Sequence, residues 1–263
     1  MHLSKMNYSI RHILTLAFLV IGFSLIGCNS TAKSHVNLPS RTKADVFTNL
    51  RKSQGVAMQN ATRGIDFATQ GQFNEAKVEF EKALKEDPFN DLAKTSIFVI
   101  ADLNDKIIES KTAILWFKGK ANFIKGLWDN AIADYSKIIQ MNPDIAGFYN
   151  SRGMVYHRKG QYDEAIADFN SAIELSRNVA EFYNNRGATY NDEGRHDKAI
   201  ADFTKAIELN PKLSRAYNNR AVAYYFKKEY DEAWEDVHKA QRLGYQVNPG
   251  FLKALREASG RQK

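Results

Sequence analysis

The chain has 263 residues, of which 44% are apolar and 25% are charged, and its formal net charge is +7. These values are ordinary for a soluble protein and leave room for one large domain or two smaller ones. A positive net charge can indicate nucleic-acid binding, but here charges of both signs alternate along the predicted helices, which favours a solvated surface over a basic stripe. We therefore expect no nucleic-acid partner.

Residues 1–27 have the pattern of a secretory signal peptide. A basic start with Lys5, Arg11 and His12 precedes the apolar run ILTLAFLVIGF, and small residues close the segment. A membrane-anchor helix is the alternative, but the run falls short of the roughly 20 apolar residues that span a bilayer. Residues 1–27 hold two of the 37 basic side chains and none of the 30 acidic ones, so their removal lowers the net charge to +5.

Cys28 is the only cysteine of the chain and directly follows this segment. A single cysteine can form no internal disulfide and cannot by itself complete a zinc site. Leu25-Ile26-Gly27-Cys28 resembles the lipobox of bacterial lipoprotein precursors. The resemblance implies cleavage before Cys28 and lipidation of its sulfur and its new amino group, and several acyl chains make membrane anchoring effectively permanent. The alternative is a cysteine that is removed or buried with the apolar segment.

Residues 28–44 are predicted to be the lipidated cysteine and a flexible tether, since they are polar and show no apolar period. In the lipoprotein resemblance, an aspartate after the cysteine marks the inner membrane. Here that residue is Asn29, so we expect the bacterial outer membrane, facing the periplasm.

A 34-residue period dominates the rest of the chain, residues 45–245. Gly119, Gly153, Gly187 and Ala221 are each 34 residues apart, and the flanking sequences YNSRGMVYHRKG, YNNRGATYNDEG and YNNRAVAYYFKK align around them. Apolar residues recur at helical spacing, which predicts two amphipathic helices per unit. The predicted units span about 57–90, 112–145, 146–179, 180–213 and 214–245.

Small and aromatic residues at fixed offsets within this period resemble the tetratricopeptide repeat family. The resemblance implies an all-α solenoid of helix–turn–helix repeats that forms a right-handed superhelix with a concave groove. Residues 91–111 break the period and are predicted to be a helical insert, with Asn104-Asp105 as a candidate break. Residues 246–263 are predicted to be a capping helix and tail, which begins at Asn248 and Pro249.

A cation precedes each helix glycine or alanine, and an acid follows it 16 residues later on the second helix. The matched signs predict an ion pair within each repeat, and a basic ladder for an acidic ligand is the alternative. The expected pairs are Arg63 with Glu79, Lys118 with Asp134, Arg152 with Asp168, Arg186 with Asp202, and Arg220 with Asp236.

The family resemblance places partner contacts on the first helix of each repeat. The residues carried over are Asn150, Met154, His157, Asn184, Ala188, Asn191, Asn218, Val222 and Tyr225. Asparagine amides both donate and accept hydrogen bonds, which suits an extended peptide backbone, although contacts between repeats explain them equally well. The aromatic cluster Trp116, Phe117, Phe123 and Trp128 is expected to be core rather than an exposed patch.

No catalytic motif, phosphate loop or metal-ligand spacing stands out, so we expect neither an enzyme nor a cofactor other than the covalent lipid on Cys28. The sequence predicts a membrane-anchored scaffold that binds protein or peptide partners in the bacterial cell envelope. Three alternatives remain open: an unlipidated cytoplasmic adaptor, a non-catalytic subunit of an envelope enzyme complex, and an enzyme with its site in the insert.

Overall fold

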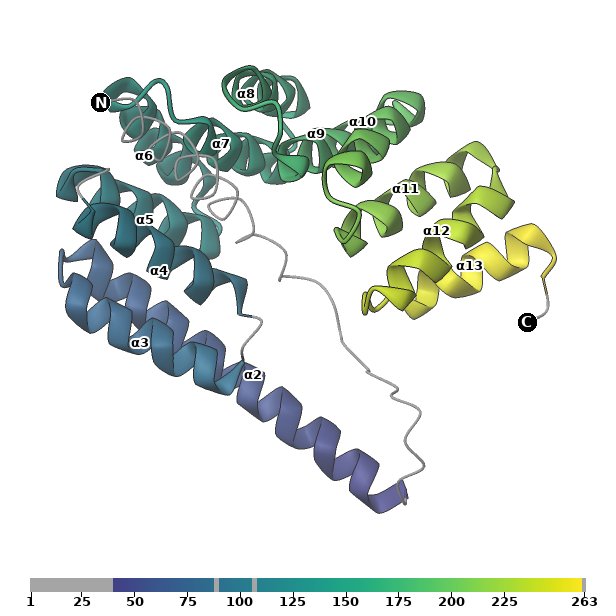
Figure 1. Ribbon diagram of the computed structural model, residues 1–263, viewed down its shortest axis with the longest axis horizontal. Coiled ribbons are helices and arrows are strands. Elements are labelled where there is room, and N and C mark those ends of the chain that lie inside the picture. Colours follow the sequence, from purple (N-terminus) through teal and green to yellow (C-terminus); the bar gives the residue numbers. More distant parts are fainter. Residues whose placement is uncertain (1–39, 88–89, 106–107, 262–263) are drawn as a thin grey trace, which may run out of the picture. The chain divides into compact units, whose positions relative to one another are not determined.

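The computed structural model describes residues 40–87, 90–105 and 108–261, and within these ranges every regular element is an α-helix (Figure 1). The helices are α2 (Ser40–Thr69), α3 (Phe73–Glu86), α4 (Asp91–Asn104), α5 (Ser110–Ile124), α6 (Trp128–Met141), α7 (Ala146–Lys159), α8 (Tyr162–Leu175), α9 (Ala180–Asp192), α10 (His196–Leu209), α11 (Ser214–Lys227), α12 (Tyr230–Arg242) and α13 (Pro249–Ser259). The expected all-α solenoid of tandem helix pairs is confirmed. The helices belong to two compact units, and the chain passes from one to the other within α7, after Val155.

The N-terminal unit begins with a helix longer than the period requires. Helix α2 starts at Ser40, so residues 40–44, which were expected to belong to the flexible tether, are helical. Ser53 Oγ donates to the Glu86 carbonyl oxygen over 2.6 Å, which places the end of α3 beside the middle of α2. The predicted signal peptide and Cys28 lie outside the described residues. None of the helices in the described ranges combines the length and apolarity needed to cross a bilayer.

The insert forms one additional helix, α4, that packs on α3 and also contacts α2 and α5. The helix ends at Asn104 with Asp105 as its C-terminal cap, where the sequence suggested a break. The N-terminal cap is Asn90, whose side chain accepts a hydrogen bond from the Ala93 backbone N–H. Leu92, Val99 and Ile100 of α4 are buried, so the insert extends the core of this unit.

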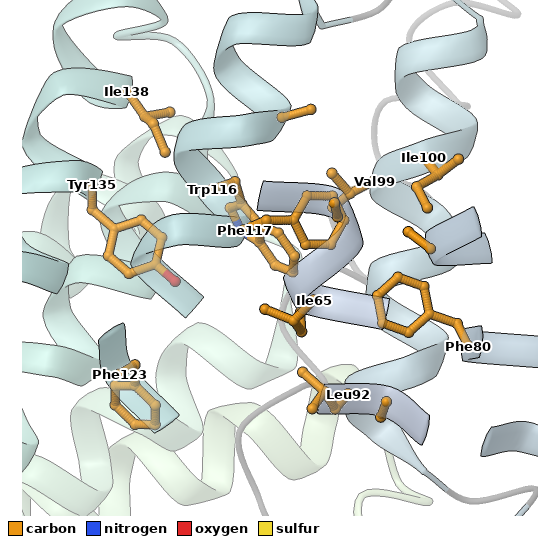
Figure 2. Packing of buried hydrophobic residues seen from close by; sticks show 14 of the residues in the cluster. Ile65, Phe80, Leu92, Val99, Ile100, Trp116, Phe117, Phe123, Tyr135 and Ile138 are labelled. Atoms are coloured by element: carbon orange, nitrogen blue, oxygen red, sulfur yellow. The ribbon is translucent and has the colours of Figure 1, made fainter. Parts of the chain in front are cut away.

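The core of the N-terminal unit is aromatic (Figure 2). Trp116 and Phe117 of α5 are at most 1% exposed, and their rings meet edge to face at 5.0 Å. Phe117 also stacks on Phe80 of α3 at 6.1 Å. Phe123 is buried, and its ring lies 5.3 Å from the half-buried Trp128. The aromatic cluster is therefore core, as expected, and joins neighbouring helix pairs.

The C-terminal unit repeats one packing scheme, in which each helix contacts the next from α8 to α13. The last helix, α13, begins as the sequence predicts: the Asn248 side chain accepts from the Gly250 and Phe251 backbone N–H groups, and Pro249 occupies the first turn. Leu255 is buried, and Phe251 and Leu252 pack on the apolar cluster of α11 and α12. Helix α13 thus covers the apolar end of the last repeat.

Within each repeat, the two helices are joined by a turn that needs a left-handed residue. Gly194 fills this position with φ of 82°, whereas Lys228 adopts φ of 64° in the last repeat. A side chain in this conformation costs roughly 1–2 kcal/mol relative to the right-handed helix. Lys228 thus makes in the last repeat the turn that a glycine makes in the preceding one.

The helices of a repeat cross at a glycine. A Cβ atom added to Gly187 would lie 2.9 Å from the Phe203 ring and 3.1 Å from the Asp202 Cβ. In the last repeat, the equivalent positions hold Ala221 and Val237, both fully buried. Where alanine replaces glycine on the first helix, valine replaces phenylalanine on the second. The side-chain volume at the crossing therefore stays similar in the two repeats.

We predict that Gly187→Ala lowers the free energy of unfolding by about 1–3 kcal/mol, because the added methyl group overpacks the crossing. Combining it with Phe203→Val recreates the pair of the last repeat, so the double variant should lose less stability than the two single losses added together. Urea denaturation of the four proteins measures this coupling. Strictly additive losses would contradict the proposed volume match.

Candidate functional site

The repeated cation and acid of the C-terminal unit form forked ion pairs. Arg186 donates from Nε to Asp202 Oδ2 over 2.8 Å and from Nη2 to Oδ1 over 2.7 Å. Arg220 binds Asp236 in the same way, over 2.7 and 2.9 Å. The hydrogen bonds with Asp202 raise the pKa of Arg186 above its ordinary value. Since both partners are largely buried, each fork fixes the angle between two helices.

The third donor of each arginine reaches back to the preceding repeat. Arg186 Nη1 donates to Asn170 Oδ1 over 2.6 Å, and Arg220 Nη1 donates to Thr204 Oγ1 over 2.9 Å. In the N-terminal unit, Arg152 Nη1 donates to Ser136 Oγ over 3.0 Å. One guanidinium of the C-terminal unit therefore joins the two helices of its own repeat and one helix of the repeat before it.

The pairs of the N-terminal repeats differ from this pattern. Arg63 lies 3.3 Å from Glu79, but its side chain is 59% exposed, and Lys82 binds the same carboxylate over 2.6 Å. Lys118 is exposed and forms no ion pair among the described residues. Its expected partner, Asp134, instead accepts a hydrogen bond from Asn122 over 2.8 Å. A lysine lacks the fork that would hold both the acid and the preceding repeat.

The expected pair of Arg152 with Asp168 joins residues of different units, and their relative position is not described. Three of the five expected pairs are thus present: Arg63 with Glu79, Arg186 with Asp202, and Arg220 with Asp236.

Two of the four expected partner-binding asparagines are buried. Asn150 is 1% and Asn184 is 3% exposed. Asn184 Oδ1 accepts a hydrogen bond from Asn219 Nδ2 of the next repeat over 3.1 Å. Burial and this contact favour the structural alternative for Asn184, because a buried amide that already bonds a neighbour is not presented to a peptide.

The other expected first-helix positions differ in their contacts. The His157 imidazole lies 2.8 Å from the Asp192 carboxylate, and Asn191 Oδ1 lies 2.9 Å from His196 Nδ1, so His157 and Asn191 each contact a polar side chain. Asn218 is half-buried and has no side-chain hydrogen bond among the described residues, and Ala188 and Val222 are half-buried apolar side chains. Half-buried Met154 lies 3.7 Å, measured at its sulfur, from Asn150 Nδ2, and Tyr225 packs on the rings of Phe226, Tyr230 and Phe251.

Sequence reasoning missed the partners that neighbouring repeats supply. Asp192, Asn219 and Arg215 were not singled out, yet Arg215 Nη2 lies 3.8 Å from Glu181 Oε1. Each of these contacts joins residues 34 or 35 positions apart. A search for complementary side chains about 34 residues apart in the sequence, rather than within one repeat, would have identified these contacts.

Comparisons with known proteins agree with this geometry. Models of the tetratricopeptide repeat match residues 67–90, 135–167, 180–213 and 203–235, and a TPR repeat model matches residues 153–192. The chain contains tetratricopeptide repeats. No curated protein matches the chain.

Solved structures with similar folds include MamA, which is 28% identical over 69% of this chain and 94% of that chain, with a TM-score of 0.49. A TPR domain of Spaghetti (RPAP3) bound to an HSP90 peptide is 27% identical over 45% of this chain and 94% of that chain, with a TM-score of 0.43. A thermophilic TPR protein of Thermus thermophilus, TTC0263, is 20% identical over 78% of this chain and 97% of that chain, with a TM-score of 0.48.

The insert helix α4 and the helix that follows it, α5, each carry a buried ionisable side chain. Asp102 of α4 is 6% and Lys120 of α5 is 1% exposed. Burial, together with the nearby Asp105 charge, raises the pKa of Asp102 to about 6. Lys120 Nζ lies 5.3 Å from the Trp116 ring centroid. No group of three or more metal-ligand side chains occurs in the described ranges.

We predict that Arg186→Ala costs about 3 kcal/mol of unfolding free energy, because it leaves the buried Asp202 carboxylate without its partner. Arg186→Lys should recover less than half of the loss, since an ammonium cannot bind Asp202 and Asn170 through one planar fork. Chemical denaturation measures both values.

The matched control is Arg63→Ala. Arg63 is 59% exposed and its acid keeps a second partner, Lys82, so the loss should stay below about 1 kcal/mol. Equal losses at positions 63 and 186 would refute the structural role of the buried fork.

Proposed function

We propose that the protein is a lipid-anchored adaptor of the bacterial cell envelope that binds protein or peptide partners through the first helices of its tetratricopeptide repeats. The alternatives are an unlipidated cytoplasmic adaptor and a non-catalytic subunit of an envelope enzyme complex. A membrane location is supported by the lipobox-like Leu25-Ile26-Gly27-Cys28 sequence. A binding role is supported by how the repeats divide their polar side chains.

The observation that carries the binding role is a contrast between neighbouring positions of α9 and α11. Asn184 and Arg186 are engaged in contacts within and between repeats. Asn218, by contrast, is half-buried and has no side-chain hydrogen bond among the described residues. Ala188, which packs partly on the Phe203 cluster, and Val222 are half-buried apolar side chains. Asn218 therefore keeps its amide available on helices that other contacts hold in place, as a preorganised binding surface requires.

The available surface combines small and apolar side chains with one amide. Such a surface suits an extended segment that contributes backbone hydrogen bonds to Asn218 and small side chains to the space beside Ala188 and Val222. The forks hold the helices beneath this surface, so binding would require little ordering of the protein.

We predict that Ala188→Glu reduces recovery of bound partners about tenfold or more, because an unpaired charge at a contact costs at least ~1.4 kcal/mol. The full chain would be cross-linked in bacterial membranes, and its co-purified proteins quantified by mass spectrometry. Ala201→Glu on the exposed face of α10 introduces the same charge and serves as the control. Equal recovery of every protein with both variants would exclude this surface as the binding site.

Lipidation is tested by the intact mass of the protein extracted from membranes. We expect a polypeptide that begins at Cys28 and carries the mass of attached acyl chains, since several chains are needed for stable anchoring. Cys28→Ser should retain residues 1–27 and lose the added mass. A wild-type protein that begins at Met1 with a free Cys28 thiol would leave the unlipidated adaptor as the correct alternative.

A further inference from the structure

A pocket of about 350 Å³ lies in the last repeat, and its lining includes none of the proposed partner-binding residues. Its lining residues are Tyr217, Glu235, Asp236, His238, Lys239 and Arg242. All but Tyr217 belong to α12, and the Tyr217 ring from α11 is 8% exposed. The volume is within the range of small-molecule sites, about 300–1,000 Å³.

In this pocket one acid has a cationic partner, whereas the two cations have no acidic partner in the described part of the chain. Asp236 is neutralised by the two hydrogen bonds from Arg220. Lys239 lies over the Tyr217 ring, with Nζ 5.9 Å from the centroid, but neither Lys239 nor Arg242 forms an ion pair or a side-chain hydrogen bond among the described residues. Two permanent cations thus face the pocket against one uncompensated acid, Glu235.

The preceding repeat shows that this arrangement is specific to the last one. There, Lys205 and Glu208 occupy the positions of Lys239 and Arg242, and they form an ion pair over 3.0 Å. The period places an acid at this second position in two successive repeats, as Glu174 and Glu208, and then reverses its sign at Arg242. The lysine of the last repeat therefore lacks the neighbour that neutralises its predecessor.

Among the described residues, His238 lacks the hydrogen bond that the equivalent residue of each of the three preceding repeats accepts from the repeat after it. Ser136, Asn170 and Thr204 each accept a hydrogen bond from the arginine of the following repeat. His238 occupies the same position, but one period after Arg220 the chain carries Ala254. The His238 imidazole packs 5.6 Å from the Trp234 ring, measured between centroids, and its nitrogens have no hydrogen-bond partner among the described residues.

We infer that this pocket binds a phosphoryl group. Lys239 and Arg242 supply the positive charge and the donors that phosphate oxygens require, and His238 can donate and add a charge when protonated. A phosphate monoester carries about −1.5 to −2 charges at neutral pH, and Lys239 and Arg242 attract it against the single acid Glu235. The group can belong to a small soluble molecule or to a phospholipid headgroup.

The test is a titration of the full-length protein, labelled in its histidine rings, with inorganic phosphate at constant ionic strength. We expect a saturable shift of the His238 ring resonances, which His238→Gln assigns. Arg242→Glu recreates the Lys205–Glu208 pairing at Lys239 and should weaken phosphate binding at least tenfold while preserving the fold. Lys253→Gln, which removes an exposed lysine of α13, should leave binding unchanged.

Acetate tests whether the pocket selects phosphate over another anion, and vesicles test whether the phosphoryl group belongs to a lipid. Equal affinity for acetate, a shift that does not saturate, or full binding by Arg242→Glu would overturn the proposal. With the phosphate result in hand, sedimentation with phosphatidylglycerol vesicles distinguishes the two sources, and the Arg242→Glu protein with the same N-terminus serves as the reference, so that any binding through residues 1–28 is common to both. Weaker vesicle binding by Arg242→Glu assigns a headgroup, and equal vesicle binding by the two proteins assigns a soluble ligand.

Discussion

The repeats of the C-terminal unit depend on the hydrogen bonds that the guanidinium groups of Arg186 and Arg220 form. The Arg186 guanidinium directs two donors to an acid of its own repeat and one to the repeat before it. Apolar packing alone would allow helices to slide, because hydrophobic contact has no direction. A planar fork has direction, so the same residue that neutralises a buried carboxylate also sets the spacing of successive repeats.

The N-terminal unit obtains its order differently. Arg63 is largely exposed and Lys118 has no ion pair among the described residues, but the aromatic rings of α5 and the added helix α4 enlarge the buried core there. The N-terminal unit thus relies more on buried apolar volume, and the C-terminal unit relies more on directional polar contacts. This division explains why the 34-residue period is clearest toward the C-terminus, where each position must satisfy a neighbour of fixed geometry.

The sequence predicted the helix pairs and the cap well, because periodicity and Asn248-Pro249 are local signals. It also predicted that Arg186 and Arg220 pair with Asp202 and Asp236, since both partners lie within one repeat. It did not separate buried Asn184 from half-buried Asn218, because identical residues differ only in what the following repeat places beside them. Nor did it predict that α2 starts at Ser40, since polar composition does not exclude a helix.

Each arginine donates a hydrogen bond to the repeat before it, so the two ends of the repeat array are not equivalent. A repeat added after α12 would bring its own arginine to His238, whereas a repeat inserted between α8 and α9 would have to offer a new acceptor to Arg186, which now binds Asn170. Loss of the last repeat would remove the partners of Thr204, Asn184 and Glu181. Gene duplication can therefore lengthen such a chain at its C-terminal end at less energetic cost than in its interior.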